Sequence, residues 1–218
     1  MAHVVMATLS PYLKIGECIN MANILEMEDN LLTEMKKNDY LHDNTIYFDT
    51  EVDRESQVKV CRMMRKIAEK ELSKPVEKRK AIKLRISSFG GSILAYFAIA
   101  SCMQEIKEKG IIIETYCDGY CCSAASKILI LGSPQHRFSS RYGEILIHQT
   151  QLGGLQGTQT ELENEMKNIK RNWETIKTIF KENTKLTDED IENLTKYNLD
   201  VVYTPQEALE KGLIDKIL

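Results

Sequence analysis

The sequence predicts an α/β protein built on a parallel sheet. From residue 45 onward, short runs rich in β-branched residues alternate with longer runs of helical period. This order is typical of βαβ units, whose strands pair in parallel. Glycines at Gly90-Gly91 and Gly110 separate several of these runs, as expected where a strand and a helix meet. The length of 218 residues is enough to bury one core of the larger kind.

Each element is predicted from its own pattern. Strands are expected where runs are short and apolar or alternating, at 45–52, 82–88, 111–117, 137–139 and 144–148. Helices are expected where apolar residues recur at helical spacing, at 56–72, 92–109, 122–131, 158–183, from 187 and at 205–212. A turn is expected at Asp118-Gly119. Helical spacing also occurs at 20–37, within an N-terminal part, residues 1–44, that is otherwise hard to interpret.

Bulk composition excludes several classes of function. A formal net charge of −3 gives no reason to expect nucleic acid or an anionic membrane as a partner. No apolar run approaches the roughly 20 residues of a membrane span, and the N-terminus does not resemble a signal peptide. The six cysteines lack zinc-like spacing, so no metal site is expected. Reduced cysteines in a cytoplasmic protein are the favoured interpretation, and a regulatory disulfide is the alternative.

Ser123 and His148 are the first candidates for chemistry. Ser123 lies where a strand gives way to a helix, although a serine there is most often only a cap. His148 ends an apolar strand, and functional residues of parallel α/β folds gather at strand ends. The pKa of histidine also suits proton transfer near neutral pH. A histidine in this position is nevertheless more often only a half-buried structural residue.

Gly90-Gly91 forms a third candidate feature, between a strand and a helix. Two glycines there leave backbone N–H groups unhindered at the positive end of a helix, which is a natural place to hold an oxyanion. As a tight turn alone, the motif is weak evidence. Asp200 is one of 32 acidic residues, and spacing alone does not select it.

Taken in order, these motifs resemble the Clp protease proteolytic subunit family over roughly residues 45–218. The matching pieces are Gly90-Gly91-Ser92, Gly119-x-x-x-Ser123, Ile147-His148-Gln149, Leu152-Gly153-Gly154-x-Gln156-Gly157 and the closing segment Glu207–Asp215. Aligning the closing segment leaves Asp200 at the family's acid position. Each piece is weak by itself, whereas the ordered combination is specific.

The resemblance implies a serine endopeptidase with a Ser-His-Asp triad. Ser123 would be the nucleophile, His148 the base, and Asp200 the residue that orients the base. Backbone N–H groups of Gly91 and Ala124 would form the oxyanion hole.

The implied fold is the crotonase-like ββα spiral with a protruding handle helix, the handle covering about 152–183. The implied assembly consists of two stacked heptameric rings that enclose the active sites, with unfolded polypeptide as the substrate. An AAA+ unfoldase would feed this chamber. ATP would be the cofactor of that partner, because this chain has no phosphate-binding loop of the Gly-x-x-x-x-Gly-Lys-Ser/Thr kind. Axial or docking contacts would fall to residues 1–44, which match the family poorly.

Around the nucleophile the chain departs from the family. Phe89 stands where the family usually has proline, and Cys121 and Cys122 replace small residues. Ala124 replaces a usual methionine, and Lys127 places a charge in a helix that the family keeps apolar.

Three alternatives remain open at this stage. The chain could be an acyl-CoA enzyme of the crotonase group, which would share the Gly-Gly oxyanion device. It could be a Ser–Lys peptidase, because Lys127 lies one helical turn from Ser123. It could also be a catalytically silent ring subunit that assembles with an active paralogue.

Overall fold

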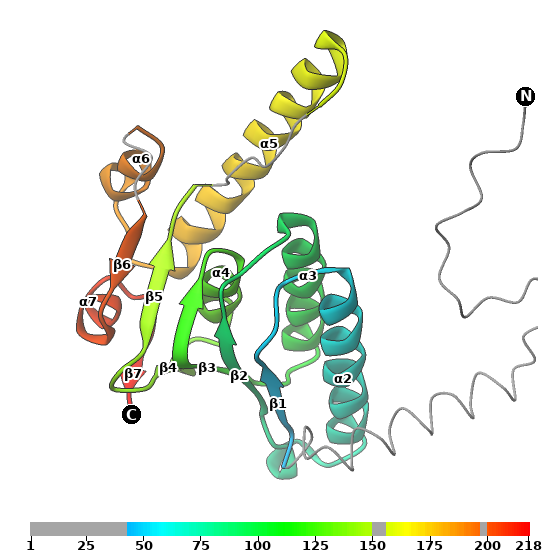
Figure 1. Ribbon diagram of the computed structural model, residues 1–218. Helices are drawn as coiled ribbons and strands as arrows, with labels where there is room; N and C mark the ends of the chain where they lie inside the picture. Colours follow the sequence, from blue (N-terminus) through cyan, green and yellow to red (C-terminus); the bar gives the residue numbers. More distant parts are fainter. Residues whose placement is uncertain (1–42, 150–155, 197–199) are drawn as a thin grey trace, which may run out of the picture. The chain divides into compact units, whose positions relative to one another are not determined.

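The computed structural model describes residues 43–149, 156–196 and 200–218, and shows a mixed α/β fold (Figure 1). Its elements are β1 (Thr45–Phe48), α2 (Arg54–Leu72), a 3₁₀ turn (Val76–Lys78), β2 (Ile82–Ser88), α3 (Ile93–Glu108), β3 (Ile113–Cys122), α4 (Ala124–Ile130), β4 (Arg137–Ser139), β5 (Glu144–Ile147), α5 (Gln159–Asn183), α6 (Asp188–Lys196), β6 (Val201–Tyr203), α7 (Pro205–Glu210) and β7 (Lys216–Ile217). The predicted α/β class with a parallel sheet is confirmed. Residues 1–42, with the predicted helix at 20–37 and most of the N-terminal segment 1–44, lie outside the described residues.

The sheet is parallel along its main path, β1-β2-β3-β4-β7. Strand β3 is long enough to pair with two strands in succession along one edge. Its first half pairs with β4, and its last residues, Tyr120–Cys122, pair with β5. Strand β6 then adds to β5 in the antiparallel direction. The end of β3 therefore lies beside a small second group of strands, and the candidate site forms there.

Helices α2, α3 and α4 lie on one face of the sheet, and the core fills the space between them (Figure 1). Strand β2 alternates accordingly, with Ile82, Leu84 and Ile86 buried and Lys83 and Arg85 partly exposed. Other fully buried large side chains are Ile46, Met64, Tyr96, Ile99, Met103, Ile106, Ile113, Ile128 and Phe180. This alternation is the period-2 pattern from which the strands were predicted.

The prediction of a turn at Asp118-Gly119 is wrong. Strand β3 continues to Cys122, and α4 begins only at Ala124. Between Ile86–Cys117 and Ser88–Cys121 the register with β2 shifts, so β3 carries extra residues there. Asp118-Gly119 is therefore a bulge inside a strand. Glycine is common in bulges as well as in turns, so the Asp-Gly pair alone does not distinguish the two.

Two other boundaries differ from the predictions. Strand β1 ends at Phe48, and Val52 is joined to the sheet region only by an isolated bridge to Gly91. The helix predicted at 158–183 is found as α5, with Thr158 as its cap in a capping box with Glu161. Residues 150–155, which hold most of the glycine-rich stretch that the resemblance places before the handle helix, lie outside the described residues.

Only the second half of α5 is packed against the body of the fold. Trp173, Ile176 and Phe180 are buried, whereas Met166 in the first half is 41% exposed. Figure 1 shows that first half projecting away from the sheet. Within the described ranges, no helix is long and apolar enough to cross a membrane. In the same part of the chain, no group of His, Cys, Asp or Glu is arranged to hold a metal ion.

Candidate active site

Ser123 occupies a strained junction between β3 and α4. Its φ of 54° and ψ of −117° are far from the usual regions for a residue with a side chain. Its N–H donates to the carbonyl oxygen of Leu146 at 2.9 Å, which ties the junction to β5. Backbone strain of this kind typically persists at functional sites, and a sharp strand-to-helix turn is how some hydrolases expose a nucleophilic serine.

The Gly90-Gly91 turn lies directly against this junction. A Cβ atom on Gly90 would stand 2.7 Å from the Cβ of Ser123 and 2.8 Å from the backbone nitrogen of Ala124. Only glycine fits this close approach, and the φ of 97° at Gly90 is also one that glycine tolerates. The amides of Gly91 and Ala124 therefore lie near one another.

Hydrogen bonds hold the turn in place. The N–H of Val52 donates to the oxygen of Gly90, and the N–H of Ser92 donates to the oxygen of Val52, both at 2.7 Å. The N–H of Gly90 donates to the hydroxyl of Ser88 at 3.2 Å. Among the described residues no acceptor is found for the N–H of Gly91. Ala124 is the first residue of α4, where N–H groups lack acceptors within the helix.

Strand register brings His148 and Asp200 to the same end of the sheet as Ser123. Cys122 pairs with Leu146 in the parallel β3–β5 ladder, so Ser123 and His148 both follow the carboxyl ends of adjacent strands. Ile147 pairs with Val201 in the antiparallel β5–β6 ladder. Continuing that register by one residue sets His148 opposite Asp200.

The contact between His148 and Asp200 is loose. Nδ1 of His148 lies 3.5 Å from Oδ1 of Asp200, too far for a good hydrogen bond. Nδ1 is buried without any hydrogen-bond partner, although the Asp200 side chain is 58% exposed. No hydrogen bond joins the Ser123 hydroxyl to the imidazole in the described part of the chain. The three side chains are thus gathered in one region but not connected in a hydrogen-bonded chain.

Burial lowers the pKa of His148 below its usual value of 6.5, and the nearby charge of Lys127 lowers this pKa further. The carboxylate of Asp200 acts in the opposite direction and raises it. The net shift is downward, so His148 is neutral at pH 7. A neutral imidazole can accept a proton, which is what a general base requires.

The sequence offered Lys127 as the partner of Ser123 in a Ser–Lys peptidase, but it did not predict that this residue is buried. Only 3% of Lys127 is exposed, and its charge lowers the pKa of His148. A signal was present, because Lys127 is the one charged residue in the apolar run Ala124–Leu131. Lysine side chains are rarely buried, so a lysine within such an apolar run indicates an unusual environment for its charge.

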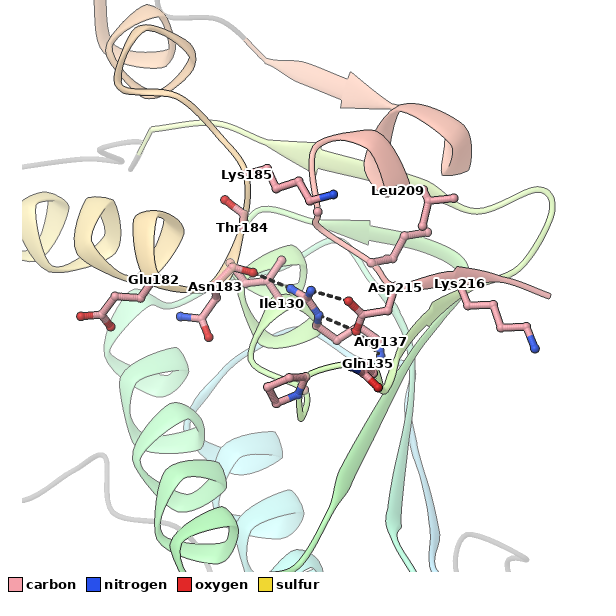
Figure 2. A pocket seen from close by; sticks show the side chains of 14 residues that line it. Ile130, Gln135, Arg137, Glu182, Asn183, Thr184, Lys185, Leu209, Asp215 and Lys216 are labelled. Carbon is pink, nitrogen blue, oxygen red and sulfur yellow. Dashed lines mark hydrogen bonds and ion pairs between the residues drawn. The ribbon is translucent and has the colours of Figure 1, made fainter.

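A surface pocket of about 560 Å³ lies where α5, α7, β4 and β7 meet (Figure 2). Its lining includes none of the candidate catalytic residues Ser123, His148 and Asp200. The guanidinium of Arg137 is held between two partners at one side of the pocket. Nε and Nη2 donate to the carboxylate of Asp215 at 2.9 and 2.6 Å, and Nη1 donates to the oxygen of Asn183.

This arrangement explains the charge state of Asp215. Burial acts to raise the pKa of Asp215, but the hydrogen bonds and charge of Arg137 more than offset this and hold the pKa low. The carboxylate of Asp215 is therefore ionised and paired with the Arg137 guanidinium. Arg137 ties the end of α5 to the C-terminal strand, and we assign this region a structural role.

Comparison with protein families identifies the family to which the chain belongs. The family model described as Clp protease matches residues 29–218. The match begins upstream of residue 45, where the resemblance based on motifs starts, and it includes β1 to β7. Because the match spans most of the chain, this protein belongs to the Clp protease family.

Proposed function

We propose that this chain is a serine endopeptidase in which Ser123 is the nucleophile, His148 the general base and Asp200 the residue that orients the base. Family membership supports peptidase chemistry. The observation that carries the assignment of residues is the strained backbone of Ser123, beside a glycine turn and at the same sheet end as His148. A serine that only capped a helix would not need a strained backbone beside a glycine turn. A histidine that was only structural would not need to lie at the same end of the sheet as that serine.

The proposed reaction proceeds in two halves. The Ser123 oxygen bonds to the carbonyl carbon of the scissile peptide as His148 takes the serine proton. The resulting oxyanion accepts hydrogen bonds from the N–H groups of Gly91 and Ala124. The C–N bond then breaks, and His148 gives its proton to the departing amine. Water, activated by His148, cleaves the acyl-enzyme ester and regenerates Ser123, so the net reaction is hydrolysis of one peptide bond.

Asp200 is the most exposed participant in this proposal. Its exposed carboxylate, 3.5 Å from Nδ1 of His148, has to move only a few tenths of an ångström to form a hydrogen bond. Catalytic hydrogen bonds are often long in the free enzyme and shorten when substrate is bound. The buried Nδ1 without a partner is the group that this movement would satisfy.

The assembly belongs to the same proposal. Subunits form two stacked heptameric rings of crotonase-like ββα spirals, and the exposed half of α5 is the handle through which the rings meet. The substrate is unfolded polypeptide inside the chamber. An AAA+ unfoldase delivers it and consumes ATP, and the complex works in the cytoplasm. The exposed first half of α5 supports a role in contacts between subunits, because the apolar side chain of Met166 there is 41% exposed.

Labelling with a fluorophosphonate tests the proposed chemistry. We expect the probe to attach to Ser123, because it reacts with serines that a neighbouring base activates. Mass spectrometry of peptides from the labelled protein identifies the site. Ser123→Ala should abolish labelling. Ser101→Ala should leave it unchanged, since this exposed hydroxyl donates to the oxygen of Phe97 in its own helix.

Two outcomes would contradict the proposal. Binding of acyl-CoA without labelling of Ser123 would favour the crotonase alternative. A correctly assembled ring without labelling would favour a silent subunit. The mass of the particle in solution tests the assembly separately, because a monomer at working concentration would exclude the chamber.

A further inference from the structure

Phe89 and Tyr120 form an exposed aromatic pair beside the glycine turn of the candidate site. Their ring centroids are 4.3 Å apart and their planes are inclined by 25°, so the two rings are stacked. Phe89 is nevertheless 75% exposed, which leaves most of its ring open to solvent. A single exposed apolar side chain is common on protein surfaces and needs no explanation. A stacked pair is a different case, because the stack holds the exposed ring in one position.

The register of the sheet brings these two residues together. Ser88 at the end of β2 pairs with Cys121 of β3, and both side chains are buried. Phe89 follows this pair on one strand, and Tyr120 precedes it on the other. Because successive side chains of a strand point to opposite faces of the sheet, the two rings lie on the face opposite the core.

The aromatic pair is close to the proposed nucleophile. Phe89 directly precedes Gly90, where a Cβ atom would stand 2.7 Å from the Cβ of Ser123. Since successive Cα atoms are about 3.8 Å apart, the Cα of Phe89 lies within about 8 Å of that serine Cβ. Tyr120 precedes Ser123 by three residues, which limits the distance between their Cα atoms to roughly 11 Å. A peptide bound at Ser123 therefore has neighbouring side chains within reach of the rings.

We propose that Phe89 and Tyr120 form a subsite for a large apolar side chain of the substrate, next to the scissile bond. This proposal rests on the proposed function, because it concerns the peptide that Ser123 cleaves. Phe89 provides the contact surface, and Tyr120 supports its ring from the other side. An aromatic side chain of the substrate packs on the open part of Phe89 and extends the stack. The subsite therefore favours peptides with an aromatic or large aliphatic residue near the cut bond.

The turn offers a peptide two kinds of contact within three residues. Among the described residues no acceptor is found for the N–H of Gly91, so this group can donate to a peptide carbonyl. Two positions earlier, Phe89 presents apolar surface. Ligand sites typically combine apolar surface with a few polar groups that fix the orientation of the ligand. The combination favours a substrate peptide as the occupant over the surface of a second subunit.

Mapping of cleavage sites in a mixture of synthetic peptides tests the subsite. Mass spectrometry identifies the cut bonds without assuming which substrate position contacts Phe89. In wild-type protein, aromatic and large aliphatic residues should be enriched at one position within about two residues of the cut bond, given the reach of the chain. This enrichment should be lost in Phe89→Ala and in Tyr120→Ala.

Two quenched fluorescent peptides then measure the size of the effect. The peptides differ only at the enriched position, which is phenylalanine in one and serine in the other. The ratio of their kcat/KM values should fall by about tenfold in Phe89→Ala, the loss expected for one aromatic contact. Both values come from the same preparation, so their ratio does not depend on the fraction of the protein that is folded and active.

Two further variants control for other causes. Tyr120→Phe keeps the stacked ring, so it should restore the selectivity that Tyr120→Ala loses. Val76 is 70% exposed, almost as much as Phe89, but it lies in the 3₁₀ turn before β2, at the opposite end of that strand. Val76→Ala should therefore leave the ratio unchanged. Loss of selectivity in either control variant would overturn the proposal, because the stacked rings would not be its cause.

The outcomes separate this inference from the proposed function. An unchanged kcat/KM ratio in Phe89→Ala overturns the subsite, even if a fluorophosphonate labels Ser123 normally. A smaller particle in Phe89→Ala, with the ratio unchanged, would identify this ring as a contact between subunits and would also overturn it. Failure of the probe to label Ser123 in wild-type protein overturns the proposed function, and the subsite with it.

Discussion

Ser123→Ala should lower peptide hydrolysis by a factor on the order of 10⁴–10⁶, which is the usual consequence of removing a member of a catalytic triad. The substitution removes only the hydroxyl. Alanine keeps the Cβ atom, so the strained φ of 54° and the contact with Gly90 persist. Fold and assembly should therefore be unchanged. Hydrolysis of a quenched fluorescent peptide, with particle mass measured in parallel, provides the test.

Ser123→Gly gives a useful second variant for this prediction. Glycine adopts the backbone angles of position 123 without strain, so this variant should be inactive but more stable than wild type by about 1 kcal/mol. A gain in stability together with a loss of activity identifies strain retained for function. Full activity in Ser123→Ala would show that another residue is the nucleophile.

Gly90→Ala should reduce kcat by roughly 10²–10³, the usual effect of losing one oxyanion donor. The new Cβ would stand 2.5 Å from the oxygen of Cys122 and 2.8 Å from the nitrogen of Ala124. These neighbours are backbone atoms, which cannot move aside independently. The turn must shift, and the amides of Gly91 and Ala124 then separate. Steady-state kinetics on the peptide substrate measure this loss.

Gly110→Ala controls for the effect of backbone strain alone. Gly110 ends the turn after α3 at a φ of 78°, and no heavy atom lies within 4 Å of the position that its Cβ would occupy. This variant should lose about 1 kcal/mol of stability, measured by urea denaturation, and keep its activity. An equal loss of kcat in both glycine variants would mean that the oxyanion turn has no special role.

Local patterns in the sequence predict much of this fold. Strand β2 was predicted with its observed bounds, because its alternation of apolar and polar residues reports one buried face. Helix α5 was predicted almost as well, because its apolar stripe is a local pattern. The bulge in β3 could not be predicted in this way. Its cause is the register with β2, which only the folded chain reveals.

The residues of the candidate site differ in the same way: some are predictable from local sequence, and others depend on the folded chain. Ser123 and His148 were selected by their places at the ends of apolar segments, which is local information. Asp200 needed the resemblance to a family, because its relation to His148 comes from the antiparallel pairing of β5 with β6. The burial of Lys127 needed the structure, because it depends on how α4 packs against its neighbours.

The account depends most on His148 making the Ser123 hydroxyl reactive. The most direct measurement is the rate constant for attachment of a fluorophosphonate to Ser123 in wild-type protein and in His148→Ala. Because the probe is small, this rate does not depend on an unfoldase or on the choice of peptide. The account predicts that His148→Ala lowers the rate constant by at least about 10²-fold, the lower end of what general base catalysis contributes. Equal rate constants in the two proteins would contradict it.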